Sequence, residues 1–275
     1  MSALLELDAG EARQSLTHRA RGHAVLLIEQ IGFGILLVGA WQLVSTRHWI
    51  NSAAMSSPSA VWDYLSNALT TRLMWTNLSA TLEATMLAFA LASVAGVVIG
   101  VSLALLPRIE RVVAPYIDAM NAMPRIALAP VFVIMFGITL SAKVALGVSI
   151  VVFIVLSAAR AGVRSVDIDI TVLARVLGAS KPQLFFKVLL PVAVPSIFAG
   201  LRLGLIYSLL GVVTSELIAS RDGLGQLIQT YASNFDIAAV YGILIILAVI
   251  AVAMNAIMGA AERWLLRWRP EAHAA

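Results

Sequence analysis

Residues 84–106 read ATMLAFALASVAGVVIGVSLALL and contain no charged side chain. A helix needs about 20 predominantly apolar residues to cross the hydrocarbon core of a bilayer, so this stretch is long enough for one span. The whole chain shares its character. Of 275 residues, 60% are hydrophobic and 12% are charged, and the mean hydropathy is +0.92. A soluble domain has about 25% charged residues, so the composition excludes a soluble enzyme and predicts an all-α integral membrane protein.

Further apolar stretches lie at residues 25–44, 112–136, 144–159, 197–217 and 237–261, so we expect about six transmembrane helices. We interpret the first as an uncleaved helix and not a signal peptide, because its polar lead is long and no small-residue cleavage site follows it. Pro115, Pro124 and Pro130 interrupt the third stretch and predict at least one kink. In the second stretch, Gly96 and Gly100 permit close helix approach, which we expect to serve packing within one chain.

The basic residues predict the orientation of the chain. With a cytoplasmic N-terminus, most of the 19 lysines and arginines fall on the cytoplasmic side, as the positive-inside rule requires. The positive net charge therefore needs no nucleic-acid partner. We expect Lys143 and Arg160, at the ends of the short 144–159 span, to reach the two lipid interfaces.

These spans divide the chain into four parts with both termini cytoplasmic. We expect a cytoplasmic tail at 1–24, a first transmembrane helix with an external amphipathic segment at 25–78, a membrane core at 79–261 and a second cytoplasmic tail at 262–275. In the external segment, Ser57 and Pro58 precede Val61, Leu65 and Ala68, a spacing that predicts a short amphipathic helix.

The cytoplasmic loop at 160–196 is more organised than a linker. Asp167 and Asp169 precede an apolar helical stretch that Gly178 ends. Ser180 then caps a second helix, which we expect Pro191 to end. The loop is thus predicted to form a helix, a glycine turn and a second helix, with more apolar side chains than a solvated loop carries, so it requires a partner surface.

The spacing within this loop resembles a known motif. Val172-Leu173-Ala174, three residues, Gly178, nine residues and Val188-Leu189-Leu190-Pro191 are similar to the EAA motif of permease subunits in bacterial binding-protein-dependent ABC importers. Its usual form is E-A-A, three residues, G, nine residues and I-x-L-P. Val172 and Leu173 stand where the family usually has Glu and Ala, which leaves open the polar contact that the glutamate would make.

The resemblance extends along the chain from about residue 58 to residue 270 and favours the nitrate/sulfonate/taurine branch. Pro124 to Pro130 with Phe136-Gly137, and later Gly200-Leu201-Arg202, Ser215-Glu216-Leu217-Ile218 and Gly223-Leu224-Gly225, are similar to that branch in the same order. The resemblance implies a type I ABC importer permease core in the inner membrane. It also implies three kinds of partner, which are cytoplasmic ATP-binding subunits, an external or periplasmic substrate-binding protein and a second permease copy, most simply in a homodimer.

The resemblance assigns coupling to the cytoplasmic loop. Residues that would transmit movement from the ATPase are Leu173, Ala174, Leu177, Gly178, Leu184 and Pro191, with Leu173, Leu177 and Leu184 as apolar docking groups. No lysine of the chain stands in a P-loop sequence, G-x-x-x-x-G-K-[ST]. The energy for transport must therefore come from a partner or from a gradient.

Arg125 is the most costly residue of the chain to leave in lipid. We expect it, with Pro124 and Pro130, to line the pathway and to attract a small anion. An ion pair with Asp118 and a position near the cytoplasmic interface remain alternatives. For Glu216, a gate or subunit contact competes with a helix-end carboxylate that reaches water. Arg202 is expected to be a cytoplasmic-side anchor.

No catalytic, metal or cofactor constellation is visible, because the chain has no cysteine and its four histidines are scattered. We therefore predict a transport subunit without an enzyme site, which carries an aliphatic sulfonate, taurine or nitrate. An aromatic carboxylate or a pyrimidine vitamin precursor is the alternative substrate. An ion-gradient-driven secondary transporter or channel is the alternative function, and it would predict buried relays or an internal repeat.

Overall fold

A computed structural model describes residues 26, 29–47 and 55–267. The secondary structure of these residues is helical and includes no strand, as the composition predicted. The chain divides into two compact units, residues 1–64 and residues 65–275. In the first unit a helix covers residues 29–46. The rest of the predicted first span, at 25–44, falls largely outside the described residues.

The short amphipathic helix predicted after residue 57 is present as α2 (Pro58–Ala68). The hydroxyl of Ser57 accepts a hydrogen bond from the Ala60 amide at 3.2 Å, so Ser57 caps the helix as predicted. Val61 is buried and its neighbour Trp62 is 70% exposed, which gives α2 two unlike faces. The indole of Trp41 donates to the Ser56 carbonyl at 2.8 Å and ties the 29–46 helix to the segment before α2.

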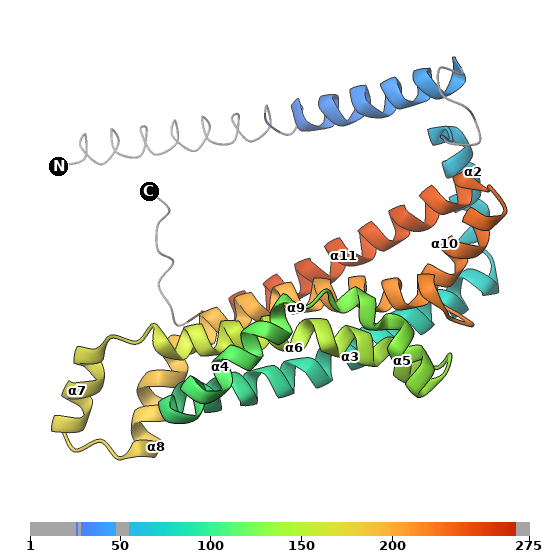
Figure 1. The fold of residues 1–275 in the computed structure, drawn as a ribbon. Helices are drawn as coiled ribbons and strands as arrows, with labels where there is room; N and C mark the ends of the chain where they lie inside the picture. The colour runs from blue at the N-terminus through green and yellow to red at the C-terminus, as the bar shows by residue number, and fades with distance from the viewer. Residues whose placement is uncertain (1–25, 27–28, 48–54, 268–275) are drawn as a thin grey trace, which may run out of the picture. The chain divides into compact units, whose positions relative to one another are not determined.

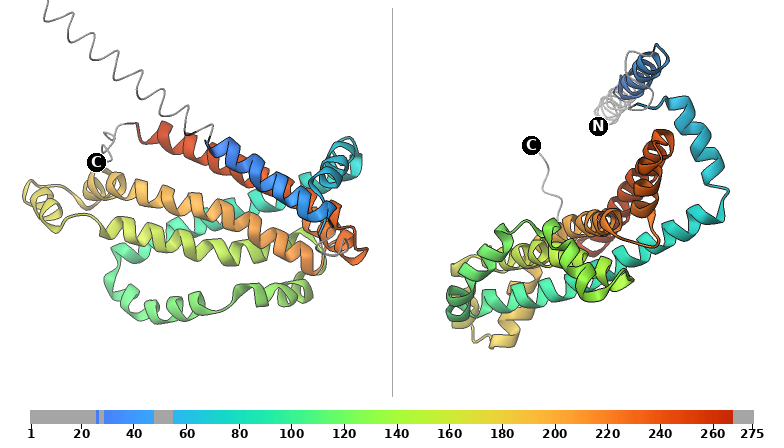
Figure 2. Two further views of the ribbon diagram at one scale, coloured as in Figure 1. Left: turned by 90° about the horizontal axis from the view of Figure 1, so that it is seen from above. Right: turned by 45° about the vertical axis from the view of Figure 1, so that its right-hand side comes forward.

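Three long helices form the core of the second unit. They are α3 (Arg72–Leu105), α6 (Leu140–Arg164) and α9 (Leu190–Ile218), which run side by side (Figures 1 and 2). α10 (Leu224–Ser233) and α11 (Ile237–Leu265) pack against α9. A Cβ on Gly100 would lie 2.5 Å from the Leu156 carbonyl oxygen, and one on Gly96 would lie 2.8 Å from that of Val152. The prediction that these glycines pack helices within one chain is confirmed.

The third predicted span is broken. α4 (Pro107–Ala122) is followed by a short 3-10 helix, η1 (Arg125–Leu128), and by α5 (Ala129–Phe136), and the two parts are bent by 83°. The break lies at Met123 and Pro124, because proline lacks the N–H that would continue the helix and forces the preceding residue out of the helical region. The predicted kink is therefore confirmed at Pro124, whereas Pro115 lies inside α4 and Pro130 opens α5.

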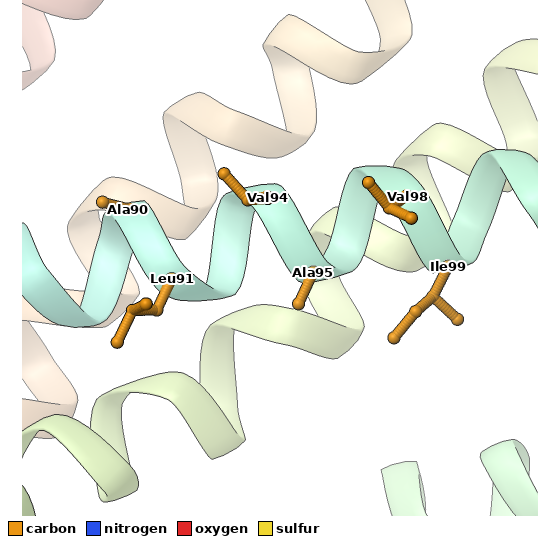
Figure 3. A pocket seen from close by; sticks show the side chains of 6 residues that line it. All are labelled: Ala90, Leu91, Val94, Ala95, Val98 and Ile99. Carbon is orange, nitrogen blue, oxygen red and sulfur yellow. The ribbon is translucent and has the colours of Figure 1, made fainter.

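Within the described residues, four single helices are long and apolar enough to cross a membrane, and the bent pair brings this number to five. The outward surface of α3 carries a shallow hollow lined by Ala90, Leu91, Val94, Ala95, Val98 and Ile99 (Figure 3). These side chains offer no hydrogen-bonding group to a ligand. This face of α3 is therefore suited to contact with lipid.

The expected ends of the 144–159 span were wrong. α6 extends well beyond the predicted 144–159 span, so Lys143 and Arg160 lie inside it. Lys143 is 4% exposed and pairs with Glu216, while Arg160 pairs with Glu110. Each charge is compensated inside the protein by a carboxylate from another helix, which the expectation of two interfacial side chains did not include.

Pro191 was expected to end the second helix of the cytoplasmic loop, and it does not. α8 (Lys181–Leu184) continues through a π-helical turn, η2 (Phe185–Leu189), directly into α9. In this turn the Leu190 amide donates to the Phe185 carbonyl, five residues earlier. A π-turn offsets the backbone by one residue, and the proline follows it without ending the helix. Residues 181–218 consequently form one helical body.

Candidate functional site

The loop at residues 160–196 forms a hairpin that projects beyond the ends of α6 and α9 (Figure 1). Its first arm is α7 (Ile168–Val176), capped by Asp167, whose side chain accepts from the Asp169 amide at 2.9 Å. Gly178 makes the turn with φ of +84°, a conformation that glycine adopts without a steric penalty. The predicted helix, glycine turn and helix are confirmed as a structure.

Ser180 starts the second arm with a capping box. Its hydroxyl accepts from the Gln183 amide at 3.4 Å, and the Gln183 side chain accepts from the Ser180 amide at 2.9 Å. The two bonds satisfy amide donors that a helix start otherwise leaves free. The backbone conformation of Gly178 therefore fixes the start of the turn, and the capping box of Ser180 and Gln183 fixes its end.

The hairpin leaves most of its apolar side chains uncovered. α7 buries none of its residues, and Val176 and Leu177 are 78% and 77% exposed. Leu173 is also exposed, and Ala174 is half-buried. Leu184 differs from the expectation, because it is 8% exposed and supports the hairpin from inside without offering a docking surface. Pro191 lies half-buried in the first turn of α9.

Arg125 lies at the break between α4 and α5, beside the middle of α6. Its guanidinium donates to the Ile150 carbonyl at 3.0 Å and to the Asn121 side-chain oxygen at 2.8 Å, and it lies 4.2 Å from the centre of the Phe153 ring. None of these partners carries a negative charge. Among the described residues Arg125 has no ion pair, so the alternative of a bond to Asp118 was wrong.

Glu216 is fully buried at the opposite end of the bundle from the hairpin. Its carboxylate accepts from the Thr81 hydroxyl at 2.9 and 3.0 Å, from the Gly225 amide at 2.9 Å and from the Lys143 ammonium at 3.2 Å. The Lys143 ammonium also bonds both the side chain and the carbonyl of Asp222. The alternative in which Glu216 reaches water was wrong, because α3, α6 and the start of α10 enclose it.

We call these contacts of Glu216, Thr81, Lys143 and Asp222, which lie at the end of the bundle away from the hairpin, the outer network. The outer network extends into the loop that precedes α10. The Asn77 side chain accepts from the Gly223 amide at 2.6 Å, and the Thr81 hydroxyl accepts from the Leu224 amide at 2.8 Å. Gly223 has φ of +111°, and a Cβ there would collide with the Glu216 carboxylate. The network thus joins α3, α6, α9 and α10 through buried polar groups that are all satisfied.

A second carboxylate joins helices at the hairpin end. Glu110, in the first turn of α4, is 3% exposed and contacts Arg160 and Arg164 near the end of α6. It is the one buried residue of α4. Arg202, in contrast, donates to the Asn255 side chain at 2.6 Å and lies 4.0 Å from Glu262, which ties α9 to α11.

Comparison with known protein families assigns the chain to one of them. A family model described as the binding-protein-dependent transport system inner membrane component matches residues 93–269. The chain belongs to this family. It is therefore a permease of a binding-protein-dependent ABC importer, as the loop motif predicted, and the family implies ATP-binding and substrate-binding partner proteins.

The names of similar proteins mention several different substrates. This permease is 32% identical to the riboflavin transport system permease RibX of Chloroflexus aurantiacus, over 85% of this chain and 87% of that one. It is 31% identical to the taurine permease TauC of Escherichia coli, over 88% and 90%. It is also 31% identical to the formylaminopyrimidine permease ThiX of Halalkalibacterium halodurans, over 73% and 80%. The predicted sulfonate/taurine branch is thus represented, together with other substrates.

Solved structures share the fold. An inward-facing methionine ABC transporter, MetNI, has a TM-score of 0.56 at 18% identity, covering 74% of the permease and 94% of that chain. An amino acid ABC transporter with histidines has a TM-score of 0.57 at 23% identity, covering 75% and 98%. The predicted all-α, type I importer fold is confirmed.

Sequence reasoning singled out Glu216 and the Gly223-Leu224-Gly225 segment but missed their partners. Asn77, Thr81, Lys143 and Asp222 were not predicted to meet them. One signal was available, since a lysine beside an apolar span is costly without a counter-charge. Which carboxylate supplies that charge depends on the packing of α6 against α9, and no local pattern encodes it.

Proposed function

We propose that this permease forms the membrane pathway for a small anionic substrate and couples its import to ATP hydrolysis by a separate ATPase subunit. The observation that carries the proposal is the hairpin, whose exposed apolar side chains project from the bundle and whose second arm is continuous with α9. An apolar surface of this kind requires a protein partner, and a continuous helix transmits movement as a rigid element.

The same residues would act in sequence during transport. The exposed Leu173, Val176 and Leu177 dock on the ATPase, Gly178 keeps the two arms at a fixed angle, and Leu184 packs the second arm against the first. Closure of the ATPase on ATP then displaces residues 181–218 as one lever. The outer network moves with this lever, because Glu216 lies near its far end.

Charge supports the orientation and the assembly that we propose. The hairpin end of the bundle carries Arg108, Arg111, Arg160, Arg164, Arg175, Lys181, Lys187, Arg263 and Arg267. By the positive-inside rule this end faces the cytoplasm, with both termini on that side and the protein in the inner membrane. A second copy of the permease completes the pathway in a homodimer.

Arg125 supports an anionic substrate. Carbonyl and amide oxygens satisfy its hydrogen bonds but leave its positive charge without a counter-ion, so an anion in a nearby water-filled pathway is attracted to it. An aliphatic sulfonate, taurine or nitrate fits this charge and the taurine and sulfonate permeases among the relatives. A pyrimidine vitamin precursor is the second candidate, favoured by the similarity to the formylaminopyrimidine permease.

Gly178 offers a direct test of coupling. In Gly178→Val, a β-branched residue at φ of +84° strains the turn, although no neighbour lies within 4 Å of the new Cβ. We expect ATP-dependent uptake to fall at least about tenfold while membrane insertion stays normal. Gly178→Asn is the matched control, because asparagine tolerates this conformation. Normal uptake by the valine variant, or uptake without the ATPase subunit, would contradict the proposal.

The substrate charge is tested at Arg125. Arg125→Gln removes the charge and should lower uptake of the sulfonate or nitrate, whereas Arg125→Lys keeps the charge and should retain part of it. The probes are radiolabelled 2-aminoethanesulfonate and nitrate, supplied with the cognate binding protein. Equal uptake by the two variants would show that the charge of Arg125 is not used.

A further inference from the structure

α4 presents three different faces along its length. The face toward the bundle has four residues that are buried or half-buried, namely Glu110, Val113, Ala114 and Ile117. A second face exposes large apolar side chains, which are Ile109, Val112, Tyr116 and Met120. At 3.6 residues per turn, Arg111, Pro115, Asp118 and Ala122 fall on a third face, and all four are exposed.

The third face carries two charged side chains, Arg111 and Asp118. Pro115 has no N–H to donate to the carbonyl of Arg111, one turn earlier, so this side of the helix also carries a weakened backbone. Within the described part of the chain the Asp118 carboxylate has no hydrogen bond and no ion pair. Asp118 is thus a charged side chain without a partner among the residues that the structure describes.

The length of α4 makes contact between Asp118 and lipid costly if this helix enters the membrane near Pro107. Asp118 lies eleven residues after Pro107, which at 1.5 Å per residue is about 17 Å along the helix. The hydrocarbon core is about 30 Å thick. A charge inside this core costs about 2.5–3.5 kcal/mol when it faces lipid, so contact with water or protein is favoured for the third face of α4.

We propose that Asp118 lines the water-filled pathway and binds a positively charged group of the substrate. This inference rests on the proposed pathway function. Asp118 and Arg125 lie on the same broken segment, and neither is neutralised by a described residue. A passage with a carboxylate and a guanidinium that both lack a counter-ion among the described residues fits a substrate that carries an ammonium group as well as an anion. A simple anion would be repelled by Asp118.

The absence of cysteine from the chain allows a test that needs neither ATP nor substrate. Single variants Asp118→Cys and Ala122→Cys in the assembled transporter are treated with membrane-impermeant charged methanethiosulfonates. Both should react, whereas the control Val94→Cys, on the apolar face of α3, should not. If Asp118→Cys is as unreactive as Val94→Cys, the residue faces lipid or the second permease copy, and the proposal is overturned.

The charge of Asp118 is tested at its neighbour one turn away. In Ala122→Cys, the cationic reagent should react faster than the anionic one, and the added change Asp118→Asn should lower this ratio several-fold. Asp118→Glu should preserve it. An unchanged ratio in the asparagine variant would overturn the proposal. Because this labelling does not depend on the ATPase, its result is separate from that of the Gly178 experiment.

The proposed ammonium group of the substrate is tested by comparing the uptake of two similar sulfonates. Vesicles with the wild-type transporter and its binding protein should take up 2-aminoethanesulfonate faster than 2-hydroxyethanesulfonate, which has nearly the same size but no ammonium group. Asp118→Asn should reduce this preference about tenfold, as expected for the loss of one charge-assisted hydrogen bond. Equal uptake of the two probes by the wild type would overturn the assignment to an ammonium-bearing substrate.

Discussion

The ammonium of Lys143 lies 3.2 Å from the carboxylate of Glu216, although 73 residues separate them in the sequence. Both side chains are almost completely buried. The pair joins the first turn of α6 to the last turns of α9, at the end of the bundle opposite the hairpin. The outer ends of these helices are therefore held by charge, whereas their middle parts are held by glycine-mediated packing.

Removal of one charge of this pair should lower the free energy of unfolding more than removal of both charges. Lys143→Met leaves the Glu216 carboxylate buried without a cation, which costs about 3–5 kcal/mol for such pairs. The double variant Lys143→Met with Glu216→Gln should recover part of this loss, because the amide still accepts from Thr81. Denaturant unfolding in detergent micelles measures both. A double variant less stable than the single one would contradict this account.

Gly223→Ala should prevent correct folding of the outer end. The new Cβ would overlap the Glu216 carboxylate, and φ of +111° is unfavourable for alanine. We expect a clear fall in melting temperature and in the yield of folded protein. Gly39→Ala is the matched control, because no atom lies within 4 Å of its Cβ, and a helical alanine gains up to about 1 kcal/mol over glycine.

Glu110→Gln should loosen the start of α4. Its carboxylate holds Arg160 and Arg164, and the remaining residues of α4 are largely exposed. Because both arginines are partly exposed and can be hydrated, we expect a loss of about 1 kcal/mol. Amide hydrogen exchange should accelerate about fivefold in residues 108–122 and stay unchanged in the middle of α9. A uniform acceleration over both helices would indicate general destabilisation instead.

Leu177→Asp should separate the permease from its ATPase subunit. Leu177 is 77% exposed at the hairpin tip, so the change should not disturb the bundle but places a charge in an apolar docking surface. The measurement is the amount of ATPase subunit that co-purifies with the permease. Asp169→Asn, on the exposed first turn of α7, is the control and should retain the subunit. Full retention by Leu177→Asp would argue against docking at this surface.

The sequence by itself determined the class of protein, most of its helices and the hairpin. Stretches without charge, such as residues 84–106, are stable only where water is excluded, either in a membrane or inside a helix bundle. The hairpin was predictable because its signals are local. Asp167, Gly178 and Ser180 act on backbone groups only a few residues away, so their effect does not depend on the rest of the fold.

The tertiary structure decided which charges meet. Lys143, Glu216 and Asp222 belong to different segments, and only the packing of α6 against α9 brings them together. The tertiary structure also placed Arg125 beside the Ile150 carbonyl and left Asp118 without a partner among the described residues, and it continues the helix through Pro191 after a π-turn. A buried charge is stable with any suitably placed counter-charge, so its identity is fixed by distance in space and not by spacing along the chain.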